Sequence, residues 1–543
     1  MAGAQNGLQW RAMKQDSLLK SSTLFSVATL ISRVLGLARD ACIAAYVPKV
    51  WQDIFWAGIK IPSTFRQLFA EGALSAAFIP ILTRMREREG EERAREVGFA
   101  VLWLLLPTVS LVVLLSIYAA PVLVPWVLDF PEGGQVIGVD ASGAPVSKVQ
   151  AGVLATQAMF PFLIFIAMAA WIMGVLNTYR YFFLPALASS LFNICLITGT
   201  IIGAHYYSGL TLLYFLSGAV ILGGFCQFAL QLIPARSIGY FPFRWVSPFH
   251  PMVREFLQKL APSVFGLAIY QLNALITQTY FASKYGEGGI STMNYAHRLI
   301  QFPLGVVGVA LATASFPRIA QLFEQERLAD AAETVQDVLK YLLLLMVPAA
   351  VGFWVVGVDI VGVIYDRGEF QQSEWLMPTY GILAVYSIGL FSYAGFSVLA
   401  RTFQAQHDFR TPVICGGVAV AVNILLCAIF VQRLPVWSLA LAAAIASTVN
   451  MGLLYLILRR RLRDLHGLSV LGFGLKVLLA ALGMGGICAG TGYLLPDPEG
   501  HFLLYLFRTA LGVSAGVAAY SLFGWILFRQ ELRQIIRRGR KAG

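Results

Sequence analysis

The sequence predicts an all-α protein that crosses a membrane many times. Of its 543 residues, 58% are hydrophobic and 13% are charged, and the mean hydropathy is +0.71. Soluble domains carry about 25% charged residues, so the usual water-facing surface is missing. Apolar runs of about 20 residues, enough to cross a hydrocarbon core, recur from Leu24 to Phe528. This pattern excludes a soluble multidomain enzyme, a disulfide-rich secreted protein and a disordered chain.

Fourteen transmembrane helices are expected between charged or Gly- and Pro-rich breaks. Their expected spans are 23–47, 52–83, 98–128, 152–177, 184–204, 210–233, 255–283, 290–317, 337–364, 379–403, 412–432, 436–458, 471–494 and 502–528. Lys and Arg are sorted between alternate loops, with 29 in one set and 5 in the other. The positive-inside rule therefore predicts that both termini are cytoplasmic. This sorting accounts for most of the net charge of +12, so no nucleic-acid partner is expected.

A weak internal repeat predicts two lobes of six helices. The stretch 72–80 resembles 308–317, six helices later, and the fifth and eleventh helices share a Pro start and an Asn-Ile pair, at Asn193 and Asn423. An offset of six helices preserves orientation, so the repeat is parallel. The expected parts are a cytoplasmic tail (1–22), an N-lobe (23–233), a cytoplasmic linker (234–254), a C-lobe (255–458), two further helices (459–528) and a basic cytoplasmic tail (529–543).

Six Lys and Arg residues that are not counted in either set of loops fall inside the expected spans. Arg508 lies near a helix end and can extend to the outer interface. The other five would together cost on the order of 12–17 kcal/mol if they faced lipid. They are Arg33, Arg39, Lys60, Arg66 and Arg298. We therefore expect a water-filled, cation-lined cavity between the first, second and eighth helices.

The first expected helix contains the motif SRVLGLARD, from Ser32 to Asp40. Arg33 and Asp40 are seven residues apart and share one helix face, and Arg39 shares a face with Ser32. One interpretation is a cationic wall in which Asp40 holds a guanidinium in place. The alternative is a structural ion pair within the membrane, which leaves the second arginine unexplained.

The second expected helix contains a polar stripe at spacings of three, four and four residues. The stripe consists of Lys60, Ser63, Gln67 and Glu71, and Arg66 lies beside it. We expect Lys60 and Arg66 to face the cavity. The alternative is that these groups join the two lobes, a role that suits Glu71.

The eighth expected helix repeats this chemistry with Asn294, His297, Arg298 and Gln301 at helical spacing, followed by Pro303. His297 is interpreted either as a pH sensor or, more simply, as a hydrogen-bonding neighbour of the arginine. Structural or gating roles are expected for Asp53, Glu71, Gly72, His297 and Pro303.

Five stretches resemble the MurJ/MviN family of lipid II flippases, within the multidrug/oligosaccharidyl-lipid/polysaccharide exporter superfamily. They are SRVLGLARD (32–40), FRQLFAEGALSAAFIP (65–80), GVLNTYRYFFLPAL (174–187), NYAHRLIQFPLGVVGVAL (294–311) and DRGEF (366–370). The resemblance covers the whole chain in order. It implies two lobes that alternate access to a central cationic cavity, and two C-terminal helices beside a groove for a polyprenyl tail.

The resemblance also implies which residues bind substrate. The family's cavity arginines correspond to Arg33, Arg39, Arg66 and Arg298, with Asp40 as their acidic partner. The full expected set adds Ser32, Lys60, Ser63, Gln67, Asn294 and Gln301. Ser63, Gln67, His297 and Gln301 depart from the residues usual in the family, which leaves headgroup contact or ion coupling at these positions open.

The implied substrate is lipid II, an undecaprenyl-pyrophosphate-linked sugar-peptide that the protein moves to the periplasmic leaflet of the bacterial inner membrane. No nucleotide-binding loop GxxxxGK[ST] is present, and we expect no cofactor, because the membrane potential favours anion export. No coupling ion is assigned. The expected partners are lipid II, membrane lipids and the cell-wall synthesis machinery, and the protein is expected to be a monomer.

Two alternatives stay open at this stage. One is a flippase for another polyprenyl-linked glycan. The other is a polytopic glycosyltransferase or ligase that uses a lipid-linked donor. Such an enzyme needs acidic or His catalytic groups on a sizeable external loop, whereas the loops at 129–150 and 365–378 are short and have no such cluster.

Overall fold

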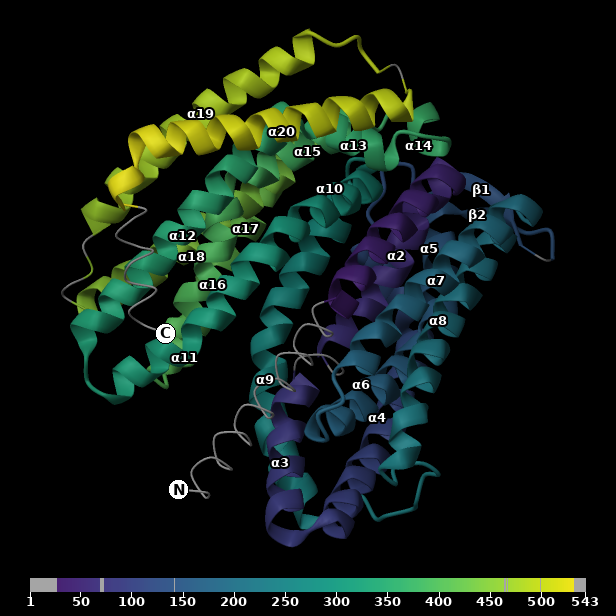
Figure 1. The fold of residues 1–543 in the computed structure, drawn as a ribbon. Helices are drawn as coiled ribbons and strands as arrows, with labels where there is room; N and C mark the ends of the chain where they lie inside the picture. The colour runs from purple at the N-terminus through teal and green to yellow at the C-terminus, as the bar shows by residue number, and fades with distance from the viewer. Residues whose placement is uncertain are drawn as a thin grey trace. The chain divides into compact units, whose positions relative to one another are not determined.

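A computed structural model describes residues 27–68, 73–140, 142–462, 465, 467–498 and 500–531 (Figure 1). Its internal contacts divide the chain into two compact units, Met1–Leu275 and Ile276–Gly543. Both consist mainly of long α-helices. The predicted all-α membrane fold is therefore confirmed.

The first unit begins with a helix over residues 27–46. Its further elements are α2 (Lys49–Arg66), α3 (Ala73–Glu89), α4 (Glu91–Val127), β1 (Val136–Val139), β2 (Pro145–Ser147), α5 (Lys148–Met159), α6 (Phe162–Thr178), α7 (Phe183–Tyr206), α8 (Gly209–Ser237) and α9 (Pro251–Leu275). The long helices α7 and α8 run side by side (Figure 1).

Small residues allow α7 and α8 to approach each other closely. A methyl group added at Gly199 would stand 2.5 Å from Ala219 Cβ, and one at Gly203 would stand 2.8 Å from the Phe215 ring. Because lipid tails are as apolar as leucine, helices in a membrane associate by such close packing rather than by the hydrophobic effect. The glycines of α7 therefore help to select α8 as its neighbour.

The expected external loop at 129–150 contains a small hairpin, in which β1 and β2 pair antiparallel. The hairpin leads into α5, where the Ser147 side chain and Gln150 form a capping box. This satisfies backbone N–H groups at the start of the helix. The sequence predicted turns here but not strands, because the paired segments are only four and three residues long.

The second unit begins with the π-helical turn η2 (Ile276–Phe281). Its further elements are α10 (Gly289–Pro303), the π-helical turn η3 (Leu304–Gly308), α11 (Val309–Glu324), α12 (Leu328–Val355), α13 (Gly357–Tyr365), α14 (Glu369–Gln372), α15 (Leu376–Ile388), α16 (Leu390–Ala405), α17 (Arg410–Phe430), α18 (Trp437–Arg461), α19 (Gly467–Tyr493) and α20 (Phe502–Leu527).

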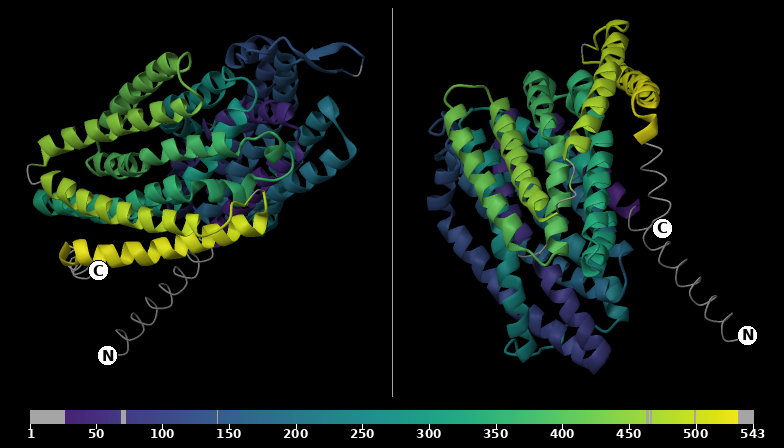
Figure 2. Two further views of the ribbon diagram at one scale, coloured as in Figure 1. Left: turned by 90° about the horizontal axis from the view of Figure 1, so that it is seen from above. Right: turned by 90° about the vertical axis from the view of Figure 1, so that its left-hand side faces the viewer.

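The last two helices pack on one edge of the second unit. An apolar core joins Leu343 of α12 to Phe473 and Val477 of α19 and to Phe528 after α20. The two helices lie side by side in Figure 1 and in both views of Figure 2. Gly516 of α20 permits this approach, because a methyl group there would stand 2.8 Å from the Cys488 sulfur.

Prolines and π-helical turns interrupt several of the helices. Pro303 ends α10, and η3 follows before α11 continues the same span. Proline lacks an N–H and clashes with the carbonyl four residues earlier, so the regular hydrogen-bond ladder is displaced there. Gln67 and Leu68 are likewise π-helical after α2, which contains Pro62. The expected helix at 52–83 overlaps α2 and α3, and residues 69–72, which include Glu71 and Gly72, lie outside the described residues.

Within the described ranges, ten helices are long and apolar enough to cross a membrane. An eleventh span results if α15 and α16, which meet at a 44° bend, are taken together. The expected spans outside this set are 23–47, 52–83 and 255–283. The count of fourteen stays a prediction.

The boundary between the units differs from the expected lobe boundary. The C-lobe is expected from residue 255 onward, and this assignment stays a prediction. In the structure α9 packs on α2, α3 and α4 and belongs to the first unit. An ion pair between Arg84 of α3 and Glu255 of α9, with 2.5 Å between nitrogen and oxygen, adds to this packing. Charge patterns in a sequence mark loops, but they do not show which neighbour a helix contacts.

Candidate functional site

Arg39 and Asp40 form a buried ion pair on the helix over residues 27–46. The Arg39 guanidinium donates to Asp40 Oδ1 from Nε at 2.8 Å and from Nη2 at 2.5 Å. Arg39 is 8% exposed and Asp40 is fully buried. Asp40 thus binds the guanidinium of Arg39, the residue directly before it in the chain, because the long arginine side chain bends back toward the carboxylate. The sequence spacing had placed Asp40 on the same face as Arg33.

Arg33 has different surroundings from Arg39. Its side chain is exposed, and it has no hydrogen-bond or ion-pair partner in the described part of the chain. The neighbouring Ser32 hydroxyl lies 2.8 Å from the Ser189 hydroxyl of α7. A charged side chain on a membrane-spanning helix is costly unless water or an anion solvates it. Arg33 is therefore the more accessible of the two arginines for an anionic ligand.

The N-terminal end of α2 contains a second buried charge. Asp53 is fully buried, and its carboxylate lies 3.9 Å from the ammonium of Lys148 at the start of α5. Lys148 is 2% exposed and also lies 3.5 Å from Glu132. The neighbouring Gln52 donates to the carbonyls of Ala44 and Val47, which end the preceding helix. These contacts attach α2 to its neighbours, in keeping with the structural role expected for Asp53.

The polar stripe of α2 continues toward the C-terminal end of the helix from Asp53. Lys60, Ser63, Arg66 and Gln67 are all half-buried. Buried between them is Thr64, whose hydroxyl donates to the Lys60 carbonyl at 2.9 Å. Lys60 and Arg66 of α2 are thus neither fully buried nor fully exposed. Glu71 and Gly72 lie outside the described residues.

In the second unit, α10 carries the remaining expected site residues. Asn294, His297 and Arg298 are half-buried, and Gln301 is exposed. His297 Nε2 lies 2.8 Å from Gln301 Nε2, a distance at which the amide donates to the ring nitrogen. The His297 ring also lies 5.7 Å from the Tyr386 ring. His297 thus has a hydrogen-bonding neighbour one turn away, and Pro303 stands directly before η3.

The structure also identifies two residues that the sequence analysis used only as markers of the repeat. Asn193 of α7 accepts a hydrogen bond from Arg39 Nη1 at 3.1 Å and donates to the Ser32 carbonyl at 3.1 Å. Asn423 of α17 donates to the Thr277 hydroxyl in η2 at 2.6 Å. Each asparagine joins the fifth helix of its predicted lobe to the first. The shared Asn-Ile pair was the available signal for this contact.

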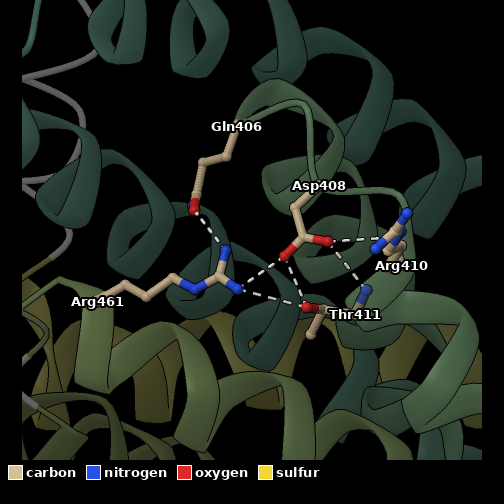
Figure 3. Close-up of polar contacts among 5 residues, drawn as sticks. All are labelled: Gln406, Asp408, Arg410, Thr411 and Arg461. Carbon is tan, nitrogen blue, oxygen red and sulfur yellow. Dashed lines mark hydrogen bonds and ion pairs between the residues drawn. The ribbon is translucent and has the colours of Figure 1, made fainter.

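A further polar cluster lies at the turn between α16 and α17 (Figure 3). Asp408 accepts hydrogen bonds from the Thr411 hydroxyl at 2.6 Å and from Arg461 Nη2 at 2.7 Å. Its other oxygen accepts from the backbone N–H groups of Arg410 and Thr411. These hydrogen bonds, those from Thr411 first, lower the pKa of Asp408 to about 2. The cluster fixes the start of α17 to the end of α18.

An apolar cavity of about 630 Å³ lies within the second unit. Its walls come from α12, from the α15–α16 bend and from α19. They include Met346, Trp354, Ile388, Phe391, Leu482 and Gly485. Trp354 and Ile388 are exposed, so the cavity opens at the surface of the unit. Its lining suits a hydrocarbon chain rather than a polar group.

The expected site residues are distributed over both units. The first contains Ser32, Arg33, Arg39, Asp40, Asp53, Lys60, Ser63, Arg66 and Gln67, and the second contains Asn294, His297, Arg298, Gln301 and Pro303. Across the described ranges, no group of three His, Cys, Asp or Glu side chains is arranged to hold a metal ion. Each unit therefore contributes at least one arginine and one amide side chain from its helices.

Long apolar helices with arginines in their spans define a multi-pass membrane transporter. The family model described as "Lipid II flippase MurJ" matches residues 48–506. The chain thus belongs to the MurJ family of bacterial inner-membrane flippases, which are transporters rather than enzymes.

Individual relatives agree with this assignment. The lipid II flippase MurJ of Burkholderia cenocepacia is 31% identical over 450 residues, which are 82% of this chain and 84% of that protein. A probable lipid II flippase MurJ of Bdellovibrio bacteriovorus is 28% identical and covers 97% of this chain and 98% of its own length.

Solved structures give the same result. A chain described as "Lipid II flippase MurJ, inward closed conformation" superposes with a TM-score of 0.74 at 25% identity, covering 94% of this chain and all of that one. An inward-facing multidrug resistance MATE family transporter is similar in fold alone, with a TM-score of 0.65 at 14% identity, covering 82% of this chain and 98% of its own.

Proposed function

We propose that the protein moves lipid II from the cytoplasmic to the periplasmic leaflet by alternating access, and that Arg33, Arg39, Arg66 and Arg298 form a cationic cavity for the pyrophosphate. Family membership supports the substrate. The observation that carries the site is the contrast on one helix between Arg39, which is paired with Asp40, and an exposed Arg33 that has no ion-pair partner within the described residues. An anionic ligand would balance the charge of Arg33.

The chemistry of the guanidinium suits this substrate. A pyrophosphate diester carries about two negative charges, and arginine contacts phosphate oxygens with two parallel hydrogen bonds. With the cell interior negative, export of an anion is favoured by about 2.3 kcal/mol per charge per 100 mV. The membrane potential is thus a sufficient driving force in this proposal, and no coupling ion is assigned.

The polyprenyl tail is proposed to bind in the apolar cavity between α12, the α15–α16 bend and α19. Its volume of about 630 Å³ and its hydrocarbon lining support this assignment. Gly485 and Gly486 of α19 lie in its wall, so larger side chains there would reduce the space. In this proposal α19 and α20 are auxiliary to the moving lobes and serve the tail.

The topology belongs to the same proposal. Both termini are proposed to be cytoplasmic, from the 29 to 5 distribution of Lys and Arg. Thiol accessibility at cysteines placed at Lys20 and Arg537 tests this, and labelling from the periplasm at either site would contradict it. We also propose that the protein acts as a monomer, with the cell-wall synthesis machinery as a partner.

The function is tested by reconstitution. Purified protein in vesicles should move lipid II between leaflets, and it should restore growth to a strain depleted of its own flippase. A polyprenyl-pyrophosphate with an unrelated glycan is the matched control. Movement of the control lipid alone would assign the protein to another glycan pathway, and sugar transfer without lipid movement would assign it to a glycosyltransferase.

A further inference from the structure

The α19–α20 pair is attached to the rest of the second unit both before and after the apolar cavity along α12. Before the cavity, the apolar core around Leu343 joins α12 to α19. The wall that α12 contributes to the cavity then extends from Met346 to Val355. After it, α13 begins at Gly357 and packs against the start of α20. The distance between α12 and the α19 wall therefore depends on both attachments.

The attachment of α13 to α20 is polar. Asp359 Oδ1 lies 3.4 Å from Arg508 Nε. Asp366 accepts a hydrogen bond from the Tyr505 hydroxyl at 3.0 Å. Both carboxylates are buried, and a buried carboxylate is costly unless it is paired or hydrogen-bonded. The start of α20 is therefore held where Arg508 and Tyr505 reach the two acids. We name these four residues the clasp.

The shapes of the two helices favour the same contact. A methyl group added at Gly362 of α13 would stand 2.5 Å from the Tyr505 ring, so glycine lets this ring lie against the backbone. The Arg367 guanidinium lies 4.7 Å from the centre of the Phe502 ring, a cation–π distance. Successive contacts move forward along α13 and backward along α20, so the two helices run antiparallel. Asp366 and Arg367 of the DRGEF motif thus belong to this attachment.

Arg508 extends the clasp to the connection between α19 and α20. Its Nη1 donates to Asp497 Oδ1 at 3.0 Å and to the Pro496 carbonyl at 3.1 Å. One guanidinium thus joins α13, α20 and the connection that leads from α19. The charge inside the last expected span is in this way paired with carboxylates from two neighbouring segments.

Close packing makes α19 follow α20. A methyl group added at Gly483 of α19 would stand 2.8 Å from the Phe523 ring of α20, and one at Gly516 of α20 would stand 2.8 Å from the Cys488 sulfur of α19. Helices packed this closely move together rather than slide apart. Because α19 forms one wall of the cavity, a shift of α20 at the clasp changes the position of that wall.

We propose that the clasp positions the α19 wall of the cavity for the polyprenyl tail, so that Asp359, Asp366, Tyr505 and Arg508 determine how well long tails bind. This inference rests on the proposed function and deepens it. The four residues act through α19, so they are positioning residues rather than contacts of the tail. Because apolar binding scales with the area buried, a displaced wall should cost a long tail more affinity than a short one.

The test compares binding of two forms of lipid II in detergent, one with the undecaprenyl tail and one with a short geranyl tail. Tyr505→Phe keeps the ring against Gly362 but removes the hydroxyl that donates to Asp366. It should weaken binding of the undecaprenyl form about tenfold and leave binding of the geranyl form unchanged. Arg508→Gln should have the same selective effect, and Arg508→Lys should restore part of the affinity because the ammonium keeps the ion pair.

Tyr285→Phe is the matched control, because it removes a hydroxyl that lies 3.0 Å from the Ser438 hydroxyl in the same unit. It should leave both affinities unchanged, and thermal unfolding of every variant is measured alongside. If Tyr505→Phe unfolds, the two Arg508 variants decide. Equal losses for both tails, wild-type affinity of the folded clasp variants for the undecaprenyl form, or the same loss in Tyr285→Phe would each overturn the positioning role. Failure of the wild-type protein to bind lipid II, or equal wild-type affinity for both tails, would instead contradict the proposed function.

Discussion

The two units make the same helix contact with different chemistry. In the first, Asn193 of α7 binds an arginine that is paired with a carboxylate. In the second, Asn423 of α17 binds the hydroxyl of Thr277 and lies near the Cys427 thiol, with no charged group among these contacts. A repeated architecture can therefore keep its packing while one copy acquires a charged site. The asparagine is common to both copies, whereas its hydrogen bond to an arginine is described in the first copy.

The largest effect is expected when the charged contact is broken. Arg39→Ala leaves the fully buried Asp40 without its main partner, so the free energy of unfolding should fall by about 3–5 kcal/mol and lipid II transport should be lost. Adding Asp40→Ala should recover much of the stability but not the transport. Chemical unfolding in mixed micelles measures the free energy of unfolding, and a vesicle assay measures lipid II transport. Recovery of transport in the double variant would show that the pair is only structural.

A large effect on transport alone is expected at Arg33. Because this side chain is exposed and unpaired within the described residues, Arg33→Ala should change stability by less than about 0.5 kcal/mol. Transport should nevertheless be abolished. Arg33→Lys keeps the charge but loses the two-pronged geometry, so partial activity is expected. Full activity in the alanine variant would remove Arg33 from the site.

A smaller effect is expected at the hydrogen bond between Asn423 and Thr277, two uncharged side chains. Thr277→Val removes the acceptor of the Asn423 amide and should lower stability by about 1 kcal/mol, the usual range for hydrogen bonds between membrane helices. Transport should continue near the wild-type rate. Loss of transport with intact stability would give the second unit a polar site of its own and would remove the contrast between the units.

The smallest effect is expected at the turn of Figure 3. Because the pKa of Asp408 is lowered to about 2 in the folded protein, its contribution to stability is present above its ordinary value of 3.8 and is lost as pH falls toward 2. Solvent screening keeps that contribution below about 1 kcal/mol. Thermal unfolding between pH 6 and about pH 3 should therefore respond less to acid in Asp408→Asn than in wild type. An identical acid response would contradict this contribution.

The composition and the distribution of Lys and Arg between loops predicted a membrane protein and the helices that contain charged residues. Both could be predicted because lipid strictly limits the composition of a chain that crosses it and the placement of its charges. Details that depend on side-chain reach were not predictable. The spacing put Asp40 with Arg33, whereas a flexible guanidinium let the adjacent Arg39 bind it. The affiliation of α9 with the first unit depends on contacts between distant segments, such as Arg84 with Glu255. Asn193 was visible as a repeated residue, but its arginine partner required the fold.

We propose above that the exposed cationic charge of Arg33, on the helix over residues 27–46, binds the pyrophosphate of lipid II. This proposal is tested most directly by lipid II translocation in vesicles with an imposed potential, comparing wild type with Arg33→Ala at matched protein content and thermal stability. We expect translocation by the wild type and none by the folded variant. Equal translocation by both proteins would contradict it.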